Sequence, residues 1–408
     1  MAKFITLESR AFPKDYFVQA IVRLLDTIEH KDTNYTHHER VDRLRYTYAA
    51  TATHFAQPHV YQALKFNHKK LEAGIRTIAL LVVDCWVSCS KETMAALAIY
   101  FTYTLILDDS EEDPQQMTET FFKDLMVGRK QRHPWLRLMI EHLPNLLSHY
   151  GPYGSLNIYR STIDFFEGCW IEQHNFKGYP GNEDYPEFLR RMNGLGHVVG
   201  STIFPAEKFD ETKYFREITT SVCQLECWMA WTNDLISFYK EFDDPRDQTS
   251  LINNYCHVGG LTLQEGLEKL THNTLRVSKQ IKSVFADKDE GVANAMSKFM
   301  HGYVTWHLCD KRYRVNEIHE GLRDDGGVTT KFCRYYEEAQ RVGGIDPAEW
   351  TGPTFLELIK EQRGQERSEL KNLLRKNNIR ELTLDVTQSL VMAFMLSVLT
   401  CIPYVVRS

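Results

Sequence analysis

The scarcity of helix breakers is the feature that most limits how this chain can fold. It has 408 residues but only 13 prolines, and none lies between Pro58 and Pro114 or between Pro245 and Pro347. Proline ends or kinks a helix because it lacks an amide hydrogen and its ring clashes with the preceding turn. Strand-like alternation bounded by turn residues is hard to find anywhere. The sequence therefore predicts an all-α fold with long helices and short loops.

Apolar residues recur at helical spacing in several segments. Residues 17–28 and 263–284 each carry apolar side chains with the helical period. The second segment is preceded by Thr262, with Glu265 three positions later, which is the spacing of a capping box. We therefore expect amphipathic helices at both places.

Two other segments are apolar on most sides. Residues 71–86 and 94–107 contain few charges, which is typical of the central helices of a large bundle. No linker rich in Pro, Gly or Ser divides the chain. We predict one helical domain with a central apolar cavity over residues 1–350 and a C-terminal extension over residues 351–408.

The C-terminal extension has two parts. A charged, helix-prone stretch comes first, and residues 386–406 then contain no charged residue. Their length is close to the ~20 residues of a bilayer span, although the polar residues among them make the segment weakly hydrophobic for that role. Docking on the bundle, loose order and membrane contact all stay open, and membrane contact is the alternative we favour least.

Charge and cysteine content restrict the function and the compartment. The chain has 48 Lys and Arg against 54 Asp and Glu, a net charge of 48 − 54 = −6, which argues against nucleic acid as a partner. Its nine cysteines are scattered and no signal peptide is recognisable. This pattern favours a reducing, cytoplasmic location with the thiols in the core. Cys85/Cys89 and Cys223/Cys227 have a spacing that zinc ligands can have, but nothing nearby completes a zinc site.

An acidic cluster follows an apolar, aromatic helix. Residues 95–107 lead directly into the acidic run 108–113. Carboxylates at a helix C-terminus face the negative end of the helix dipole and need compensating cations. Asp108 and Glu112 share a helix face, which continues the stripe through Phe101. Paired carboxylates beside an apolar pocket suit Mg²⁺, although an isolated acidic run is also typical of a solvated loop.

A second oxygen-rich set supports the metal interpretation. Asn233, Ser237 and Glu241 are spaced four and four apart, so an amide, a hydroxyl and a carboxylate lie along one helix face. Asn and Ser are poor helix formers in the middle of an apolar run, so their presence suggests a function. The three oxygens suit one Mg²⁺, and Lys240 lies beside them to contact an anion.

A competing aspartate-rich stretch follows this helix. Residues 243–247 match, letter for letter, the aspartate-rich pattern of chain-elongating prenyltransferases. Pro245 disfavours helical geometry at the residue before it, so these carboxylates are not expected to share one face. We rank the Asn-Ser-Glu set above them.

Longer strings resemble a known family. The combination of an aspartate-rich motif after an apolar helix with Asn-x3-Ser-x2-Lys-Glu resembles the class I terpene synthases. The likeness to the trichodiene synthase family of fungal sesquiterpene cyclases extends from about residue 13 to residue 350, and its most specific strings are residues 133–135, 164–173, 188–197 and 233–247.

The resemblance implies a fold, a substrate and a reaction. It implies an all-helical bundle whose cavity takes farnesyl diphosphate, with three Mg²⁺ ions that bind the diphosphate. Ionisation releases diphosphate, and the carbocation cyclises to trichodiene. Another cyclic sesquiterpene, a chain-elongating prenyltransferase and a non-catalytic helical binder are the alternatives. The resemblance also implies a homodimer, although no interface can be read from the sequence.

The family's site residues can be carried over to matching positions. Asp108 matches the first metal-binding aspartate, and Asp109 matches the neighbour that hydrogen-bonds an arginine on closure. Glu112 stands where the family's stricter motif has Asp, and its longer side chain still reaches a metal ion or a water bound to that ion. The remaining positions match the second metal set Asn233, Ser237 and Glu241, the diphosphate-sensing Arg190, and the diphosphate-holding Lys240, Arg312 and Tyr313.

Arg190 and several aromatic residues have competing interpretations. Arg190 and Arg191 together resemble a surface pair, but Gly194 and Gly196 allow a helix break and a close backbone approach beside them. Aromatic faces stabilise a cation by ~2 kcal/mol or more when desolvated. Ordinary core packing is the alternative for each candidate of the cavity wall, which are Phe101, Tyr103, Trp228, Trp306 and Tyr313.

Overall fold

The computed structural model describes residues 12–108, 114–242, 248–322 and 327–376, with side chains as far as residue 369. All regular elements in these ranges are helices, so the predicted all-α fold is confirmed. Asp109, Glu112, residues 243–247 and the segment 386–406 lie outside the described residues.

The first half of the chain forms helices α1 to α10, and the acidic motif begins at the last residue of α5. They are α1 (Lys14–Ile28), α2 (His37–Ala56), α3 (Pro58–Leu64), α4 (His68–Cys85), α5 (Lys91–Asp108), α6 (Pro114–Thr118), α7 (Phe121–Met126), α8 (Pro134–Leu147), α9 (Pro152–Gln173) and α10 (Tyr185–Asn193).

The second half of the chain forms the remaining helices of the bundle and the C-terminal helix. Its elements are α11 (Gly196–Thr202), α12 (Phe215–Glu241), α13 (Leu251–Gly259), α14 (Leu263–Phe285), α15 (Glu290–Cys309), the 3₁₀ turn η1 (Lys311–Tyr313), α16 (Val315–Glu320), α17 (Val328–Gly343), the 3₁₀ turn η2 (Pro347–Glu349) and α18 (Phe355–Lys376).

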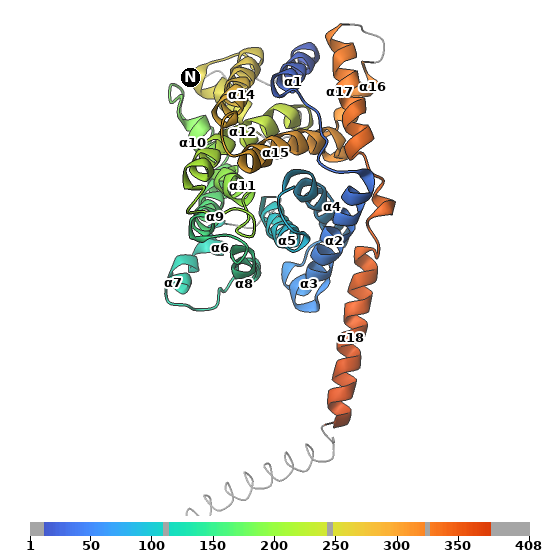
Figure 1. The fold of residues 1–408 in the computed structure, drawn as a ribbon. Coiled ribbons are helices and arrows are strands. Elements are labelled where there is room, and N and C mark those ends of the chain that lie inside the picture. Colours follow the sequence, from blue (N-terminus) through green and yellow to red (C-terminus); the bar gives the residue numbers. More distant parts are fainter. Residues whose placement is uncertain (1–11, 109–113, 243–247, 323–326, 377–408) are drawn as a thin grey trace, which may run out of the picture.

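The centre of the bundle consists of the helices that the sequence marks as apolar on most sides. Helix α4 packs against α2, α5 and α15, and α12 packs against α11, α14 and α15 (Figure 1). Nearly every residue of α5 from Thr93 to Leu107 is buried. The predictions of central helices at 71–86 and 94–107 are therefore confirmed, and Thr262 and Glu265 form the predicted capping box of α14.

A glycine-dependent break separates α10 from α11. Helix α10 ends at Asn193, Leu195 adopts a left-handed conformation with φ of 54°, and α11 begins at Gly196. A Cβ atom on Gly196 would lie 2.5 Å from the Cα atom of Glu226 on α12. The predicted helix break is present, and the absent side chain lets α11 lie directly against α12.

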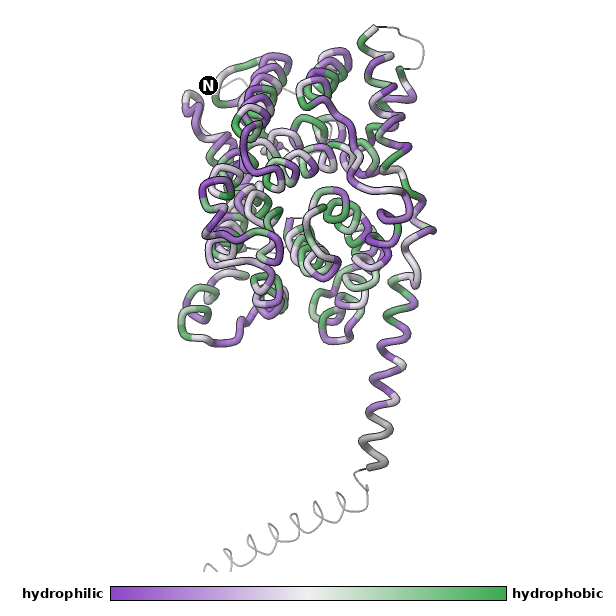
Figure 2. The backbone as a smooth tube through the Cα atoms, in the orientation of Figure 1, coloured by the Kyte–Doolittle hydropathy of each residue, from purple (hydrophilic) through white to green (hydrophobic). Residues whose placement is uncertain are grey.

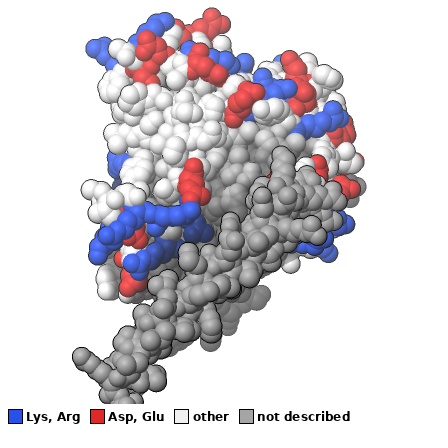
Figure 3. Space-filling model, turned by 90° about the horizontal axis from the view of Figure 1, so that it is seen from below, with Lys and Arg blue, Asp and Glu red and all other residues white. Residues whose placement is uncertain are grey.

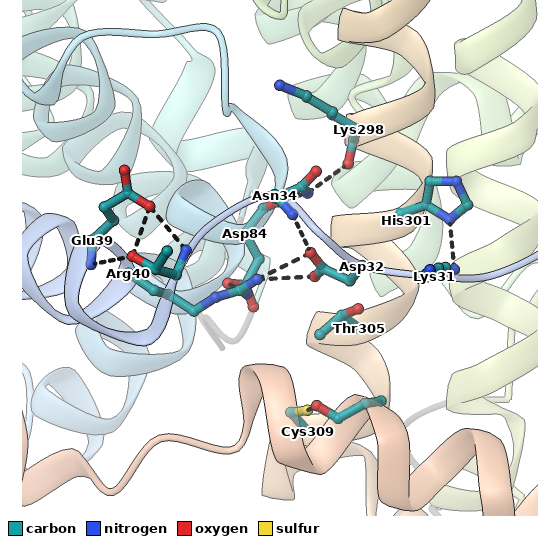
Figure 4. A network of polar contacts seen from close by, with 12 residues as sticks. Lys31, Asp32, Asn34, Glu39, Arg40, Asp84, Lys298, His301, Thr305 and Cys309 are labelled. Atoms are coloured by element: carbon teal, nitrogen blue, oxygen red, sulfur yellow. Dashed lines mark hydrogen bonds and ion pairs between the residues drawn. The ribbon is translucent and has the colours of Figure 1, made fainter.

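A buried ion-pair network joins the α1–α2 loop to α4 and α15. Arg40 of α2 is fully buried and its guanidinium contacts Asp84 at the end of α4 and, at 3.1 Å, Asp32 (Figure 4). Asn34 Nδ2 donates to the backbone oxygens of Asp84 at 3.3 Å and of Lys298 on α15 at 3.0 Å. These contacts fix α15 relative to α4, and α15 leads into η1.

The C-terminal helix leaves the bundle. Phe355, Leu358 and Ile359 in its first two turns are buried, after which α18 runs away from the other helices (Figure 1) and becomes hydrophilic (Figure 2). The predicted domain boundary at residue 350 stays a prediction.

The face seen from below carries a broad area with few charges, and side chains of both signs gather along its margin (Figure 3). Among the described residues, no helix is both long and apolar enough to cross a bilayer.

Candidate active site

Asp108, the first residue of the acidic motif, lies beside two side chains of α9. Asp108, Cys169 and Glu172 each offer one ligand atom, and these atoms all lie within 4.8 Å of one another. Burial, and then the negative charge of Asp108, raises the pKa of Glu172 to about 8. Two carboxyl groups held this close form a pair that a divalent cation would stabilise.

The three oxygen groups predicted on α12 lie along one side of that helix. The side chain of Ser237 is buried, and its Oγ atom has no hydrogen-bond partner among the described residues. Glu241 is the last residue of α12, and the Nζ atom of Lys240 lies 3.8 Å from its Oε1 atom. A buried hydroxyl without a partner is costly, so this position is suited to a ligand.

Arg190 connects the two sets of oxygen groups. Its Nη2 donates to Asn233 Oδ1 at 3.1 Å, and its Nη1 donates to Asn193 Oδ1 at 3.1 Å. Asn193 Nδ2 in turn donates to Glu172 Oε1 at 2.5 Å. A continuous hydrogen-bond path therefore runs from Glu172 on α9 through α10 to Asn233 on α12.

Asp234 keeps Arg190 charged and in place. The Nε atom of Arg190 donates to Asp234 Oδ2 at 2.7 Å. Burial by itself would lower the pKa of Arg190, but the carboxylate of Asp234 more than offsets this effect and the pKa is raised. Burial raises the pKa of Asp234, although the guanidinium opposes the shift. Arg190 is therefore a largely buried cation of the bundle, with 17% of its side chain exposed, and is not part of a surface pair with Arg191.

His307 and Tyr313 orient the amide of Asn233. His307 Nδ1 donates to the backbone oxygen of Tyr303 at 2.7 Å, which leaves Nε2 to accept from Asn233 Nδ2 at 3.1 Å. Asn233 Nδ2 also donates to Tyr313 Oη at 3.4 Å. Burial lowers the pKa of His307 to about 3, so the ring is neutral and can accept. The Oδ1 atom of Asn233 consequently points toward Arg190.

Arg312 and Tyr313 belong to the 3₁₀ turn that follows α15. The side chain of Asp310 accepts a hydrogen bond from the backbone nitrogen of Arg312 at 2.9 Å and so caps the turn. Tyr313 is buried, whereas Arg312 is half-buried. The turn thus brings the Tyr313 hydroxyl to Asn233, and Arg312 is the residue before Tyr313 in the chain.

A chain of aromatic rings runs through the middle of the bundle. Phe101 contacts Trp86 with ring centroids 5.1 Å apart, and Trp86 contacts Phe299 at 5.5 Å. The chain continues through Trp228 and Tyr303 to Trp306, and Trp306 contacts Tyr313 at 5.1 Å. Four of the five predicted wall residues, Phe101, Trp228, Trp306 and Tyr313, are therefore joined by direct ring contacts or through one or two intervening rings.

Tyr103, the fifth predicted wall residue, lies in a different group. It is two residues from Phe101 on α5 and so faces another direction. Its hydroxyl is 2.8 Å from His54 Nε2, and its ring contacts Phe55, Trp135 and His142. Its neighbours come from α2 and α8 and do not include the aromatic chain.

The sequence analysis did not single out Glu172, Asn193, Asp234 or His307. Glu172 could have been found, because it continues the apolar stripe of Phe165 and Cys169 just as Asp108 continues the stripe of α5. No pattern distinguishes His307 from other polar residues of a buried helix, since its role depends on a contact across 74 positions of sequence.

Comparisons with known proteins show the family of this chain. The family model described as Trichodiene synthase (TRI5) matches residues 11–369. A trichodiene synthase of Stachybotrys chartarum is 53% identical over 360 residues, which cover 88% of this chain and 94% of that protein. One from Fusarium asiaticum is 55% identical over 348 residues, covering 85% and 93%. A crystal structure of an α-eudesmol synthase covers 65% of this chain and 94% of its own with 16% identity and a TM-score of 0.47, a likeness too low to support an argument.

The all-helical fold and these matches define a class of protein, the terpene cyclases, which are lyases. Within that class, the chain belongs to the trichodiene synthase family.

Proposed function

We propose that this protein converts farnesyl diphosphate to trichodiene in a Mg²⁺-dependent reaction that releases diphosphate. The observation that carries the proposal is the polar path from Glu172 through Asn193 and Arg190 to Asn233, which gathers oxygen ligands and a cation beside an aromatic interior. Two relatives with more than half of their aligned residues identical are named trichodiene synthase, and this favours trichodiene as the product.

The residues present fit magnesium. Asp108 and Glu172 would supply carboxylate oxygens on one side, and Asn233, Ser237 and Glu241 would supply three oxygens on the other. The unpartnered Oγ of Ser237 supports this assignment, because a metal would satisfy it. We propose three ions with substrate bound. Magnesium, when bound, neutralises the diphosphate and makes it a better leaving group.

Cationic side chains of this chain would hold the diphosphate. Arg190 is part of the polar path, Lys240 lies next to Glu241 at the end of α12, and Arg312 follows α15 next to Tyr313. Their charges stabilise the negative charge that develops as the bond between C1 and oxygen breaks and the electron pair leaves with the diphosphate. Arg190 already binds Asn233 Oδ1, so we propose that it exchanges this oxygen for a phosphate oxygen when substrate enters.

Aromatic rings would protect and guide the resulting carbocation. Phe101, Trp228, Trp306 and Tyr313 are buried and belong to one chain of rings. Their faces stabilise positive charge, and the exclusion of water prevents early quenching of the cation. Loss of a proton from the last cation then gives the neutral hydrocarbon. Tyr103 is left out of this proposal because its contacts lie in another group.

Product analysis tests the proposal. Purified protein incubated with farnesyl diphosphate and Mg²⁺ is expected to release trichodiene, detected by gas chromatography with mass spectrometry, and chelation of Mg²⁺ should stop the release. Asn233→Ala and Ser237→Ala should each abolish turnover. The matched control, Thr219→Ala, removes an exposed hydroxyl from the same helix and should behave like the wild type.

Different products would identify the alternatives. A different cyclic hydrocarbon would keep the substrate and reject trichodiene. Longer prenyl diphosphates formed after addition of isopentenyl diphosphate would indicate chain elongation. Recovery of unreacted substrate under all conditions would indicate a binding protein without this activity.

Two further properties belong to the proposal. We place the protein in the cytosol, because the eight cysteines of the described part are all thiols. We also propose a homodimer, as in the resemblance, which sedimentation velocity would test through the mass of the particle.

A further inference from the structure

Three large apolar side chains are exposed together at the end of α7. Phe122 is 56% exposed, Met126 84% and Val127 59%. Helix α7 lies at the periphery of the bundle, away from the central helices (Figure 1), and this stretch is among the hydrophobic parts of the tube there (Figure 2). Apolar residues that cluster on a surface usually mark an interaction site. We name Phe122, Met126 and Val127 the α7 tip.

The α7 tip is held in place by the residues around it. Phe121 is buried, and its ring lies 5.5 Å from that of Phe166 on α9. Gln131 Nε2 donates to the backbone oxygen of Phe121 at 3.2 Å, and the nitrogen of Arg129 donates to the backbone oxygen of Asp124 at 2.7 Å. Because the loop closes back on α7, the exposure of the tip is a fixed feature of the fold.

Exposed basic residues lie next to the α7 tip in the sequence. Residues 119–132 contain four basic residues and two acidic ones, in a chain whose net charge is −6. One of the two acidic residues, Asp124, is buried and lies 3.8 Å from Arg132 Nε, and Lys130 Nζ lies 3.3 Å from Glu141 Oε1. Lys123 and Arg129 therefore supply most of the positive charge of the segment. The basic residues are exposed and comprise Lys123, Arg129, Lys130 and Arg132.

We propose that the α7 tip docks on the surface of an anionic lipid bilayer. Apolar side chains on a protruding element enter the boundary between headgroups and acyl chains, and neighbouring Lys and Arg are attracted to anionic headgroups. A stable protein–protein interface needs about 800 Å² from each partner, whereas three side chains on a short protruding helix suffice for shallow insertion. The inference is independent of the proposed reaction and of the C-terminal segment 386–406.

Vesicle co-sedimentation with the full-length protein tests the inference. We expect binding to vesicles of phosphatidylcholine mixed with phosphatidylserine and little binding to phosphatidylcholine alone. Raising the salt to 1 M, where the screening length falls to about 3 Å, should reduce the bound fraction.

Two double variants test the apolar and the basic parts separately. F122S/M126S is expected to lower the vesicle partition coefficient at least fivefold, and K123E/R129E should lower it by at least as much, since each basic residue near the surface contributes about fivefold. The matched control L156S removes a side chain that is 62% exposed on α9 and should leave the partition coefficient unchanged. Thermal unfolding of each variant should coincide with that of the wild type, because these side chains are exposed.

Three outcomes of the vesicle assay would overturn the inference. These are an absence of binding to both kinds of vesicle, equal binding of F122S/M126S and wild type, and a loss caused by charge reversal alone, which would indicate non-inserting adsorption. Capture of an acidic protein without any binding to vesicles would also overturn it and would point to a protein partner.

Discussion

A double-mutant cycle on Asp108 and Glu172 would show whether α5 and α9 share a metal ion. The two side chains place ligand atoms within 4.8 Å of each other, although they lie on different helices. Asp108→Asn and Glu172→Gln each keep the shape of the side chain and remove its charge. If one ion bridges both carboxylates, each single variant loses most of the site and the second substitution adds little.

The geometry sets the size of the expected coupling. Residues that share one network usually couple by about 0.5–3 kcal/mol, and the ligand atoms of Asp108 and Glu172 lie within 4.8 Å of each other. Asp108 is exposed and therefore partly screened by solvent, so we expect a coupling energy of about 2 kcal/mol. The increase in Mg²⁺ requirement of the double variant should therefore be about thirtyfold smaller than the product of the two single increases.

The assay is the initial rate of diphosphate release as a function of Mg²⁺ concentration. Each single variant should need at least about thirtyfold more Mg²⁺ for half-maximal rate. Asp164→Asn is the matched control on α9, because Asp164 pairs with Arg160 on the helix surface. Losses that add to within about 0.5 kcal/mol would show that the two carboxylates act independently and would refute the shared ion.

Further predictions concern a positioning residue and the buried ion pair. His307→Phe leaves the amide of Asn233 without its acceptor and should raise the Mg²⁺ requirement about tenfold, whereas His307→Gln keeps an acceptor and should restore part of the affinity; equal effects of the two would contradict the role. Arg40→Met leaves Asp32 and Asp84 buried without their cation and should cost about 3–5 kcal/mol of unfolding free energy in chemical denaturation, and a loss below about 1 kcal/mol would contradict this expectation. Burial raises the pKa of Asp84 from 3.8 to about 7 against the opposing effect of Arg40, so the folded state holds this proton more tightly than the unfolded chain. The stability that Asp84 contributes is therefore complete below about pH 4 and is lost as the pH rises through about 7. We expect the unfolding free energy of the wild type to fall over this range relative to that of Asp84→Asn. A wild-type value that rises while that of Asp84→Asn stays flat would contradict this expectation.

The fold could be predicted because it depends on local patterns. Helical periodicity and the absence of proline located α4 and α5, the spacing of Thr262 and Glu265 predicted the start of α14, and two glycines predicted the break before α11. Each of these features is encoded within a few residues, so no tertiary information was needed.

The site could be predicted only where its residues follow a local spacing. Asn233, Ser237 and Glu241 share one helix, and the four-residue repeat shows them together. Glu172 and His307 act through contacts between helices that are far apart in sequence, and a single sequence does not contain those distances. Residue type alone can also suggest a position that the structure does not give. The aromatic ring of Tyr103 suggested the cavity wall, but Tyr103 lies two residues from Phe101 on α5 and its side chain contacts His54.

The central claim is that α5, α9 and α12 together hold the metal ions that bind a diphosphate. The most direct test is a crystal structure of the full-length protein with Mn²⁺ and inorganic diphosphate, in which the anomalous signal of manganese locates every ion. We expect ions beside Asp108 and Glu172 and an ion beside Asn233, Ser237 and Glu241, with the diphosphate between them and in contact with Arg190. Ions bound elsewhere, or a diphosphate that does not contact α12, would contradict the account.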